Sequence, residues 1–274
     1  TPGCAPTVLL LCVKSGATAE AAALLAGSVP PGTPVVSMQN GVSNVGVARQ
    51  AAPTLHWLPG MVPYNVAELA PGGFHRGTRG RLAAQDDPVL RRWQPAFAAA
   101  GLPLDLHADL RPVQWGKLLL NLNNAVNALS GLPLREQLLD VAWRQVTAAL
   151  IAEALDVLAA AGIAPARLSP VPPRWIPSVL RLPTPLFRCV AAGSLRIDAR
   201  ARSSMADDLA LGRSTEVDML QGEVVRLARS LGRSAPLNER MVQLGAAQHG
   251  ATPRWRGDTL QRALGIVGTS EPRR

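Results

Sequence analysis

The two lysines of this chain, Lys14 and Lys117, are the first residues to consider for chemistry. They are the only lysines among 28 basic residues, and all the others are arginines. Arginine replaces lysine where a surface charge is enough, but its pKa above about 12 prevents it from giving up a proton. A chain that avoids lysine elsewhere is expected to keep it where a proton is transferred or a compact ammonium must fit. The composition therefore indicates a chemical role for both residues.

Lys117 lies on a polar stripe within an otherwise apolar segment. Residues 113–130 are predicted to form one helix, and at about 100° per residue Lys117, Asn121 and Asn124 share a narrow face. An ammonium and two amides are costly to bury without partners. Two interpretations stay open. The stripe is either a substrate cradle, with Lys117 as proton donor and Asn121 as an orienting amide, or a solvated face whose lysine reaches water.

Lys14 and the sequence Gln39-Asn40-Gly41 each follow an apolar strand. Residues 7–13 predict a strand buried on both faces, residues 18–26 a helix, and residues 34–38 a second strand, which together make a parallel βαβ unit. Both polar segments then lie at the carboxyl ends of neighbouring strands, where open α/β sheets bind ligands. Asn-Gly is also typical of a hairpin turn, and Lys14 could simply end its strand.

A second group of polar residues lies further along the chain. Ser203 and Ser204 precede Met205 and two aspartates, and Thr215-Glu216 follows Gly212. These residues could contact a ligand. They could equally cap the starts of two helices, since serine, threonine and acidic side chains stabilise helix N-termini.

The elements that must position these residues fall into an α/β part and an all-α part. We expect a partial α/β domain with a parallel sheet over residues 1–108, in which short apolar pieces between residues 55 and 106 add outer strands. A helical domain is expected over residues 109–250, and an Arg-rich tail without regular structure over residues 251–274. The proline-rich stretches 169–173 and 182–185 are predicted to be connections. Further helices are predicted over residues 43–52, 88–100, 142–161, 205–211 and 215–231.

Composition excludes several other classes of protein. The net charge is +9, but the arginines form no dense run and there is one tyrosine, so a solvated basic surface is favoured over a nucleic-acid site. No apolar stretch approaches the roughly 20 residues of a membrane span. Three cysteines far apart show no metal-ligand spacing and argue against a disulfide framework, which favours a reducing cytoplasm. No G-x-S-x-G sequence supports a serine hydrolase.

Taken in order, these sequences resemble the ketopantoate reductase family. The resemblance covers roughly residues 7–245, and both lysines fall on functional positions of the family. Any one match is weak, whereas seven in register are specific. They are Lys14-Ser15, Gln39-Asn40-Gly41, Lys117-Leu118-Leu119-Leu120-Asn121, Ser203-Ser204-Met205 with Asp208, Thr215-Glu216-Val217-Asp218, Gly222 and Pro236-Leu237-Asn238.

The resemblance implies a Rossmann-type sheet domain followed by a helical domain like the C-terminal one of 6-phosphogluconate dehydrogenase. It implies NADPH-dependent reduction of the keto acid 2-dehydropantoate (ketopantoate) to pantoate, on the route to pantothenate and coenzyme A. A homodimer in the cytoplasm is expected, with no nucleic acid, membrane or metal ion as partner.

The resemblance also assigns roles to individual residues. Lys117 would be the general acid that protonates the keto oxygen, as a cationic donor beside a developing alkoxide should. Asn40, Asn121 and Ser204 would bind substrate. For the cofactor, the residues implied are Lys14, Asn40 and Glu216.

Two departures from the family pattern limit these expectations. The family carries a second substrate asparagine eight residues after the lysine, where this chain has Ala125, and the adjacent Asn124 is the expected substitute. The G-x-G-x-x-G loop that holds the cofactor pyrophosphate is absent from the chain, as if roughly 60 residues were missing before Thr7. We therefore expect this chain alone to bind NADPH poorly.

Three alternatives remain open. A related reductase would act on another 2-keto acid, and a non-catalytic remnant would use its helical domain only for dimerisation or binding. A nucleic-acid-binding module is the most distant of the three.

Overall fold

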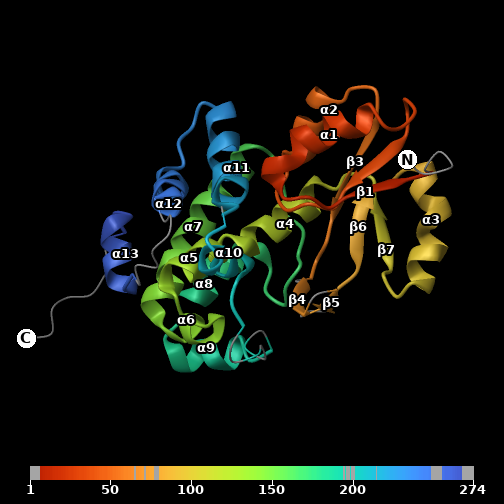
Figure 1. The fold of residues 1–274 in the computed structure, drawn as a ribbon. Helices are drawn as coiled ribbons and strands as arrows, with labels where there is room; N and C mark the ends of the chain where they lie inside the picture. The colour runs from red at the N-terminus through yellow and green to blue at the C-terminus, as the bar shows by residue number, and fades with distance from the viewer. Residues whose placement is uncertain are drawn as a thin grey trace, which may run out of the picture. The chain divides into compact units, whose positions relative to one another are not determined.

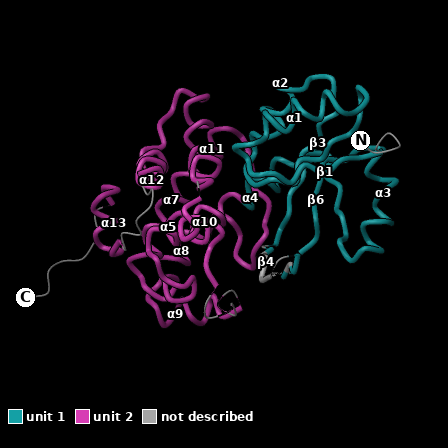
Figure 2. The backbone as a smooth tube through the Cα atoms, in the orientation of Figure 1, with its two compact units in different colours: residues 1–117 teal, residues 118–274 magenta. Residues whose placement is uncertain are grey.

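The computed structural model describes residues 7–64, 66–70, 72–76, 80–193, 195, 198, 201–213, 215–247 and 255–266. The chain divides into two compact units, residues 1–117 and residues 118–274 (Figure 2). The division falls inside a helix, whereas the sequence predicted a domain boundary near residue 108, where the last strand ends. The predicted fold class, a mixed α/β part followed by an all-helical part, is confirmed (Figure 1).

The first unit is built on a five-stranded sheet with the order β1-β2-β3-β6-β7. The first three strands are parallel, β6 runs antiparallel to β3, and β7 is parallel to β6. The predicted outer strands therefore join the same sheet. The strands are β1 (Leu9–Leu11), β2 (Pro34–Ser37), β3 (His56–Met61), β6 (Leu82–Gln85) and β7 (Leu104–His107), and a separate hairpin pairs β4 (Val66–Ala70) with β5 (Gly73–Arg76).

Alternation along the strands gives the sheet two apolar faces. Val35 and Trp57 face helices α1 (Thr18–Ala26) and α2 (Asn44–Ala51), both packed on one side of the sheet (Figure 1). The buried indole of Trp57 donates to the carbonyl of Ala52 at 2.9 Å, so its polar atom is satisfied. These contacts hold the two helices that follow β1 and β2.

The other face of the sheet packs against α3 (Pro88–Ala99). Val36 and Leu58, one residue along from the preceding pair, contact the fully buried Leu90 of this helix. Asp87 caps the helix by accepting from the amide of Val89 at 2.8 Å. A helix on each face is what a Rossmann-type sheet requires.

β1 lies at one edge of the sheet, and it is less buried than the sequence predicts. Leu11 is buried, but Leu10 is 46% exposed and Val13 is 37% exposed. The prediction of a strand buried on both faces is wrong for these residues. An edge strand has a neighbouring strand on one side only. Among the described residues, Leu10 is not part of the apolar core that contains Leu90 of α3.

The second unit is all-helical and is arranged around α7. This 20-residue helix has ten buried side chains and contacts α5, α6, α8, α11, α12 and α13. The helices are α4 (Arg111–Asn121), which enters from the first unit, α5 (Asn123–Ser130), α6 (Leu134–Leu139), α7 (Val141–Ala160), α8 (Ile176–Leu180), α9 (Thr184–Val190), α10 (Ser204–Ala210), α11 (Val217–Ser230), α12 (Pro236–Ala246) and α13 (Gly257–Ala263).

A carboxylate of α7 caps the start of α12. Glu153 accepts from the amide of Leu237 at 2.9 Å and from the amide of Asn238 at 2.8 Å, two N–H groups without partners inside the helix. It also accepts from the side chain of Asn238 at 2.8 Å. The Pro236-Leu237-Asn238 sequence therefore has a structural role here, the docking of α12 on α7.

A helix lies within the segment that was predicted to lack regular structure. Residues 257–263 form α13, in which Leu260 is fully buried. Gly257 allows the approach, because a Cβ there would lie 2.8 Å from the Cβ of Ala142. Gln261 then donates to the carbonyl of Ala142 at 2.8 Å. The sequence prediction is wrong for these residues because this short helix, about two turns long, gains its burial from α7 and not from its own pattern.

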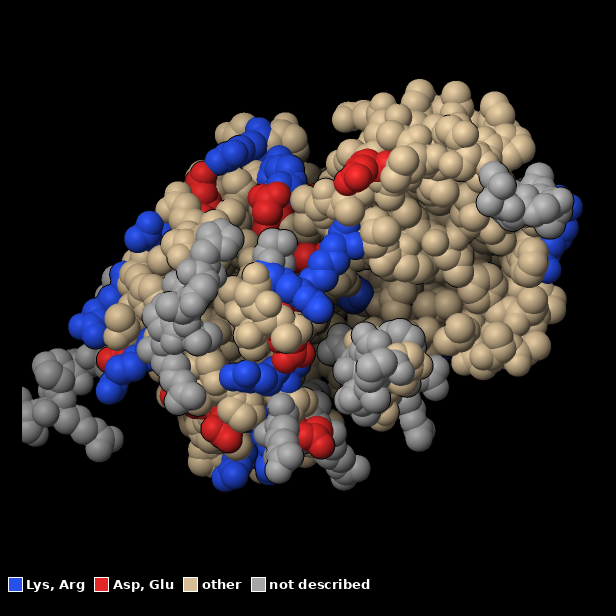
Figure 3. All heavy atoms as spheres, viewed as in Figure 1, with Lys and Arg blue, Asp and Glu red and all other residues tan. Residues whose placement is uncertain are grey.

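The surplus of arginine lies on the surface and is partly paired locally. Arg81 binds Asp105 at 2.8 Å and Arg226 binds Asp218 at 2.9 Å, with all four side chains at least 40% exposed. Figure 3 shows basic and acidic side chains interspersed over the helical unit on the face in view. Such pairs contribute little to stability. In the part of the chain that the structure describes, no helix is both long and apolar enough to cross a membrane.

Arg144 of α7 is fully buried and joins α7 to the connection after α8. Its guanidinium donates to the carbonyls of Leu180, Leu138 and Leu182 at 3.0, 3.0 and 2.8 Å, and lies 4.4 Å from the ring centre of Phe187. Burial lowers the pKa of this guanidinium. Arg144 thereby holds the end of α8 beside the start of α9. Residues 182–185 were predicted to be a connection, which is wrong for Thr184 and Pro185 because they form the first turn of α9.

Arg144→Met should destabilise the helical unit by about 3 kcal/mol or more, because one buried and two partly buried carbonyls lose their donor and methionine supplies none. Urea unfolding measures the change. Arg181→Met is the matched control, since Arg181 is exposed. Equal stability of the two variants would contradict the role given to Arg144.

Candidate functional site

The ammonium of Lys117 is held by oxygen atoms at the ends of two strands of the sheet unit. Its Nζ donates to Oδ1 of Asn40 at 2.8 Å and to the carbonyl of Val62. Asn40 follows β2 and Val62 follows β3, the next strand of the sheet. Lys117 and Asn40, two of the residues singled out from the sequence, are therefore brought together across 77 positions of chain.

The backbone of Asn40 is anchored at its carbonyl. This oxygen accepts from the side-chain amide of Asn44 and from the hydroxyl of Ser15 at 3.3 Å. Ser15 and Asn44 are both buried. The anchors come from the loops after β1 and β2, so the predicted meeting of these loops at the carboxyl ends of parallel strands is confirmed.

Gln39 is the centre of a buried hydrogen-bond network beneath Asn40. Its amide nitrogen donates to the carbonyl of Val13 at 2.9 Å and to the hydroxyl of Thr18 at 2.8 Å, and its oxygen accepts from Ser37 at 2.8 Å. Thr18 in turn donates to Oδ1 of Asn44 at 3.2 Å. Every polar atom of the Gln39 side chain thus has a partner, which fixes the loop that carries Asn40.

Gly41 completes the turn after Asn40 with a backbone φ of 89°. This region favours glycine, because a Cβ there is strained. The chain then enters α2 and not a second strand, so the Asn-Gly pair belongs to a loop at a strand end. The hairpin alternative is wrong.

The predicted stripe of Lys117, Asn121 and Asn124 is divided by a break in the helix. The sequence predicted one helix over residues 113–130, but α4 ends at Asn121 and α5 begins at Asn123. The side chain of Gln221 donates to the carbonyl of Leu122 at 2.9 Å. A side chain inserted into the backbone ladder is a usual cause of such a break.

Ser203 and Asn124 meet within the helical unit. Ser203 caps α10 by accepting from the amide of Ala206 at 3.2 Å, and its hydroxyl donates to the carbonyl of Asn124 at 3.1 Å. Asn127 accepts from the amide of Ser203 at 2.9 Å. The capping interpretation is therefore confirmed for Ser203, which leaves the exposed Ser204 at the first position of α10 as the serine open to a ligand.

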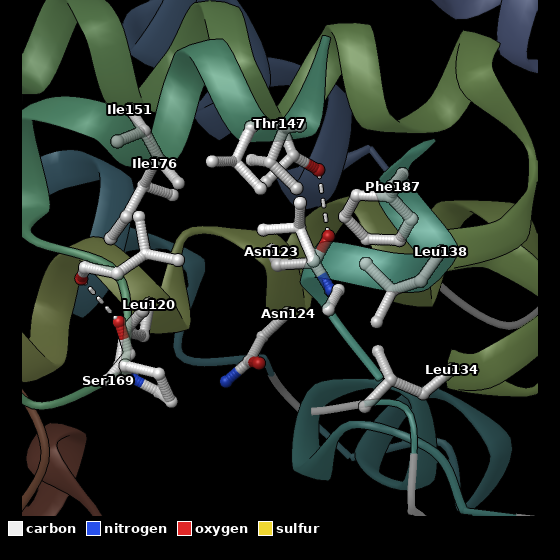
Figure 4. A pocket seen from close by; sticks show the side chains of 16 residues that line it. Leu120, Asn123, Asn124, Leu134, Leu138, Thr147, Ile151, Ser169, Ile176 and Phe187 are labelled. Carbon is white, nitrogen blue, oxygen red and sulfur yellow. Dashed lines mark hydrogen bonds between the residues drawn. The ribbon is translucent and has the colours of Figure 1, made fainter. Parts of the chain in front are cut away.

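A pocket of about 250 Å³ lies within the helical unit and includes Asn124 in its wall (Figure 4). Next to it, Asn123 accepts from Thr147 at 2.7 Å and exchanges two hydrogen bonds with Gln137. Asn123 is thus a structural residue. Ala125, at the position where the family carries a substrate asparagine, is only 1% exposed and faces the core.

The remaining predicted residues are placed as follows. Lys14 is exposed beyond the end of β1, and Asn121 is half-buried in the last turn of α4. Glu216 is half-buried immediately before α11. Partial burial raises the pKa of Asp207, close to Ser204, against the opposing charge of Arg202. Among the described residues, no three His, Cys, Asp or Glu side chains are grouped so that they could hold a metal ion.

Sequence reasoning missed two parts of this site. Val62 contributes a backbone oxygen, and no side-chain pattern could indicate it. Asn44 and Thr18 are buried polar residues near the starts of two helices. Short polar side chains at such positions often bond to nearby backbone, and this tendency could have indicated that they anchor a strand-end loop.

The first unit is a Rossmann-type α/β fold with polar loops at its strand ends, and the second unit is all-helical. The chain belongs to the ketopantoate reductase family PanE/ApbA. The family model matches residues 4–88, and the model of the family's C-terminal part matches residues 109–249.

Relatives named 2-dehydropantoate 2-reductase share about three tenths of their residues with the chain. The one from Halobacterium salinarum is 29% identical over 243 residues, which cover 86% of this chain and 74% of the relative. The one from Caulobacter vibrioides is 30% identical over 218 residues, covering 79% and 68%. A crystal structure of a PanE/ApbA family ketopantoate reductase from Ralstonia eutropha is similar, with a TM-score of 0.74, 26% identity and coverage of 93% and 77%.

Asn44→Ala should loosen the loop that carries Asn40, because the Asn40 carbonyl loses a donor and Thr18 loses its acceptor. We expect faster amide hydrogen exchange over residues 39–44. Turnover should fall about tenfold or more, since small displacements of reacting groups are costly. Gln50→Ala, an exposed change on the same helix, is the control. Unchanged exchange in Asn44→Ala would remove the positioning role.

Proposed function

We propose that this protein reduces 2-dehydropantoate to pantoate with NADPH, and that Lys117 is its general acid. The observation that supports the proposal most is the hydrogen bond from Lys117 to Asn40 at 2.8 Å, at the carboxyl edge of the sheet. Ligands of open α/β sheets bind at this edge. The proposal also draws on the family to which the chain belongs and on the names of its relatives.

The chemistry asked of Lys117 follows from the charge that the reaction creates. When a keto carbon accepts hydride, its oxygen becomes an alkoxide, which a nearby ammonium stabilises by charge and then neutralises by transferring one proton. Lys117 is left as a neutral amine and regains a proton from water. Asn40 and the carbonyl of Val62 accept from the same Nζ, so they orient the ammonium before the reaction.

Four polar residues are proposed to contact the substrate, and they are Asn40, Asn121, Asn124 and Ser204. Asn124 takes the place of the family asparagine because it lines a pocket, whereas Ala125 is buried. Ser204 is exposed and adjacent to the residue that bonds Asn124.

The residues present fit one end of a nicotinamide cofactor. Three polar residues, none of them fully buried, could contact the cofactor: Lys14, Asn40 and Glu216. Gly41, in the loop after β2, has no side chain that would obstruct it. These residues would hold the nicotinamide and ribose end, while residues 1–274 contain no G-x-G-x-x-G sequence for the pyrophosphate. When bound, the cofactor supplies the hydride. The preference for NADPH over NADH rests on the resemblance.

The proposal extends to assembly and location. A homodimer in the cytoplasm that contributes pantoate to pantothenate synthesis fits the family resemblance. A relative acting on a different 2-keto acid is the second candidate, and Ala125 favours it, because a hydrogen-bonding side chain that the family uses for substrate is replaced by a methyl group.

Lys117→Ala should lower turnover of 2-dehydropantoate by a factor on the order of 100 to 10,000, the usual contribution of general acid catalysis. Lys117→Arg should lower turnover by a similar factor, because arginine keeps its proton. NADPH oxidation measures both, in protein that includes any residues encoded before Thr1. Arg111→Ala, an exposed change on the same helix, is the control. Turnover that survives Lys117→Ala would overturn the assignment.

A further inference from the structure

The junction between α4 and α5, residues 122–124, is held by side chains from elsewhere in the helical unit. At its start, Gln221 of α11 donates to the carbonyl of Leu122 at 2.9 Å. At its end, Ser203, which caps α10, donates to the carbonyl of Asn124 at 3.1 Å. These partners lie 99 and 79 positions away along the chain, so tertiary contacts set the position of the junction backbone.

The middle residue of the junction, Asn123, is bound through its side chain. Its oxygen accepts from Thr147 at 2.7 Å, as Figure 4 shows, and from Gln137 at 3.0 Å. Its nitrogen donates to Gln137 at 3.2 Å. Thr147 and Gln137 are both buried. Side chains of α6, α7, α11 and the α10 cap thus act on three successive residues, and such a network makes a backbone segment rigid.

Two of the amides proposed for the substrate lie at the two ends of the junction. Asn121 immediately precedes it, and Asn124 is its last residue. Both residues are half-buried, and within the parts of the chain that the structure describes neither side chain makes a hydrogen bond. The direction of each amide therefore depends on the backbone that carries it, which the contacts to the junction fix.

Gln221 is fully buried, but only one end of its side-chain amide is used. Its nitrogen bonds the carbonyl of Leu122, whereas among the described residues its Oε1 has no hydrogen-bond partner. A buried acceptor without a partner is unfavourable for stability. Methionine has a similar length and would avoid that cost, but it would leave the Leu122 carbonyl without this donor. The bond to the junction therefore accounts for a glutamine at this position better than stability does.

We propose that Gln221 is a positioning residue of the reaction, which acts through the junction on the substrate amides Asn121 and Asn124. The proposal rests on the proposed reductase function and on the roles of these two amides in it. The bond from Gln221 fixes the backbone at Leu122, and thereby the arrangement in which both amides meet the substrate. Helix α11 also packs against α7 and α12, so loss of this bond would free the junction and leave Glu216, at the start of α11, in place.

Steady-state kinetics of Gln221→Met tests the proposal, in protein that includes any residues encoded before Thr1. We expect the KM for 2-dehydropantoate to rise about tenfold, because displaced amides bind the substrate less well, and the KM for NADPH to stay within about twofold. A purely structural role would lower the amount of folded enzyme, and hence the apparent kcat, without changing either KM. Thermal unfolding checks that the variant folds.

A second variant and a matched control accompany Gln221→Met. Gln221→Asn stays polar but is one methylene too short to reach the Leu122 carbonyl, so it should also raise the KM for 2-dehydropantoate. Gln261→Met is the control, because Gln261 is a buried glutamine that donates to a backbone carbonyl, that of Ala142, outside the junction. It should leave both KM values unchanged.

The effect of Gln221→Met should also depend on the amides that it positions. In protein that already carries Asn121→Ala and Asn124→Ala, it should change the KM for 2-dehydropantoate by less than about twofold, because residues that act through one another are not additive.

An unchanged KM in a folded Gln221 variant, an equal effect in both backgrounds, or failure of both Gln221 variants to fold would each overturn the proposal. The proposed function fails by a different result, which is turnover that is insensitive to Lys117→Ala. Turnover that depends on Lys117 while the KM ignores Gln221 would keep the reductase function and remove only the positioning role.

Discussion

The ammonium of Lys117 sets the requirement that the sheet unit has to meet. A cation withdrawn from water needs oxygen acceptors, because leaving it uncompensated costs on the order of several kcal/mol. Asn40 and the carbonyl of Val62 are two of them. They follow β2 and β3, and parallel neighbours end at the same edge of a sheet. The position of the proposed acid therefore depends on the parallel pairing of these two strands.

Both of these acceptors are neutral. An amide oxygen and a peptide oxygen orient the ammonium through hydrogen bonds without carrying a full charge themselves. The buried network around Gln39 has the same character, since it joins hydroxyls, amides and a carbonyl. Burying neutral polar groups costs little free energy when each group has a hydrogen-bond partner. The loop is thereby made rigid without adding charge beside Lys117.

Local sequence patterns predicted the elements that depend mainly on residues close to them in the chain. The βαβ unit, the α1 range and the meeting of Lys14-Ser15 with Asn40 followed from apolar runs and short links. The end of α4 at Asn121 did not, and the carbonyl of the next residue, Leu122, accepts from Gln221, 99 residues away. Helix α13 depends on α7, and Arg144 of α7 depends on the carbonyls of Leu180 and Leu182; composition does not reveal these long-range partners. The residue types singled out Lys117 and Asn40, which the structure brings together, but no sequence pattern indicated the backbone oxygen of Val62.

The end of α4 at Asn121 and the start of α5 at Asn123 affect which side chains after Lys117 can face a ligand. In an unbroken helix, Lys117 and the residue eight positions later would share roughly one side, which is where the family uses an asparagine. Here Ala125 packs into the core at 1% exposure, while Asn124 lies in the pocket wall. Among the described residues, the position at which the family carries its asparagine is therefore closed to a ligand, and the neighbouring Asn124 is the one that lines a pocket.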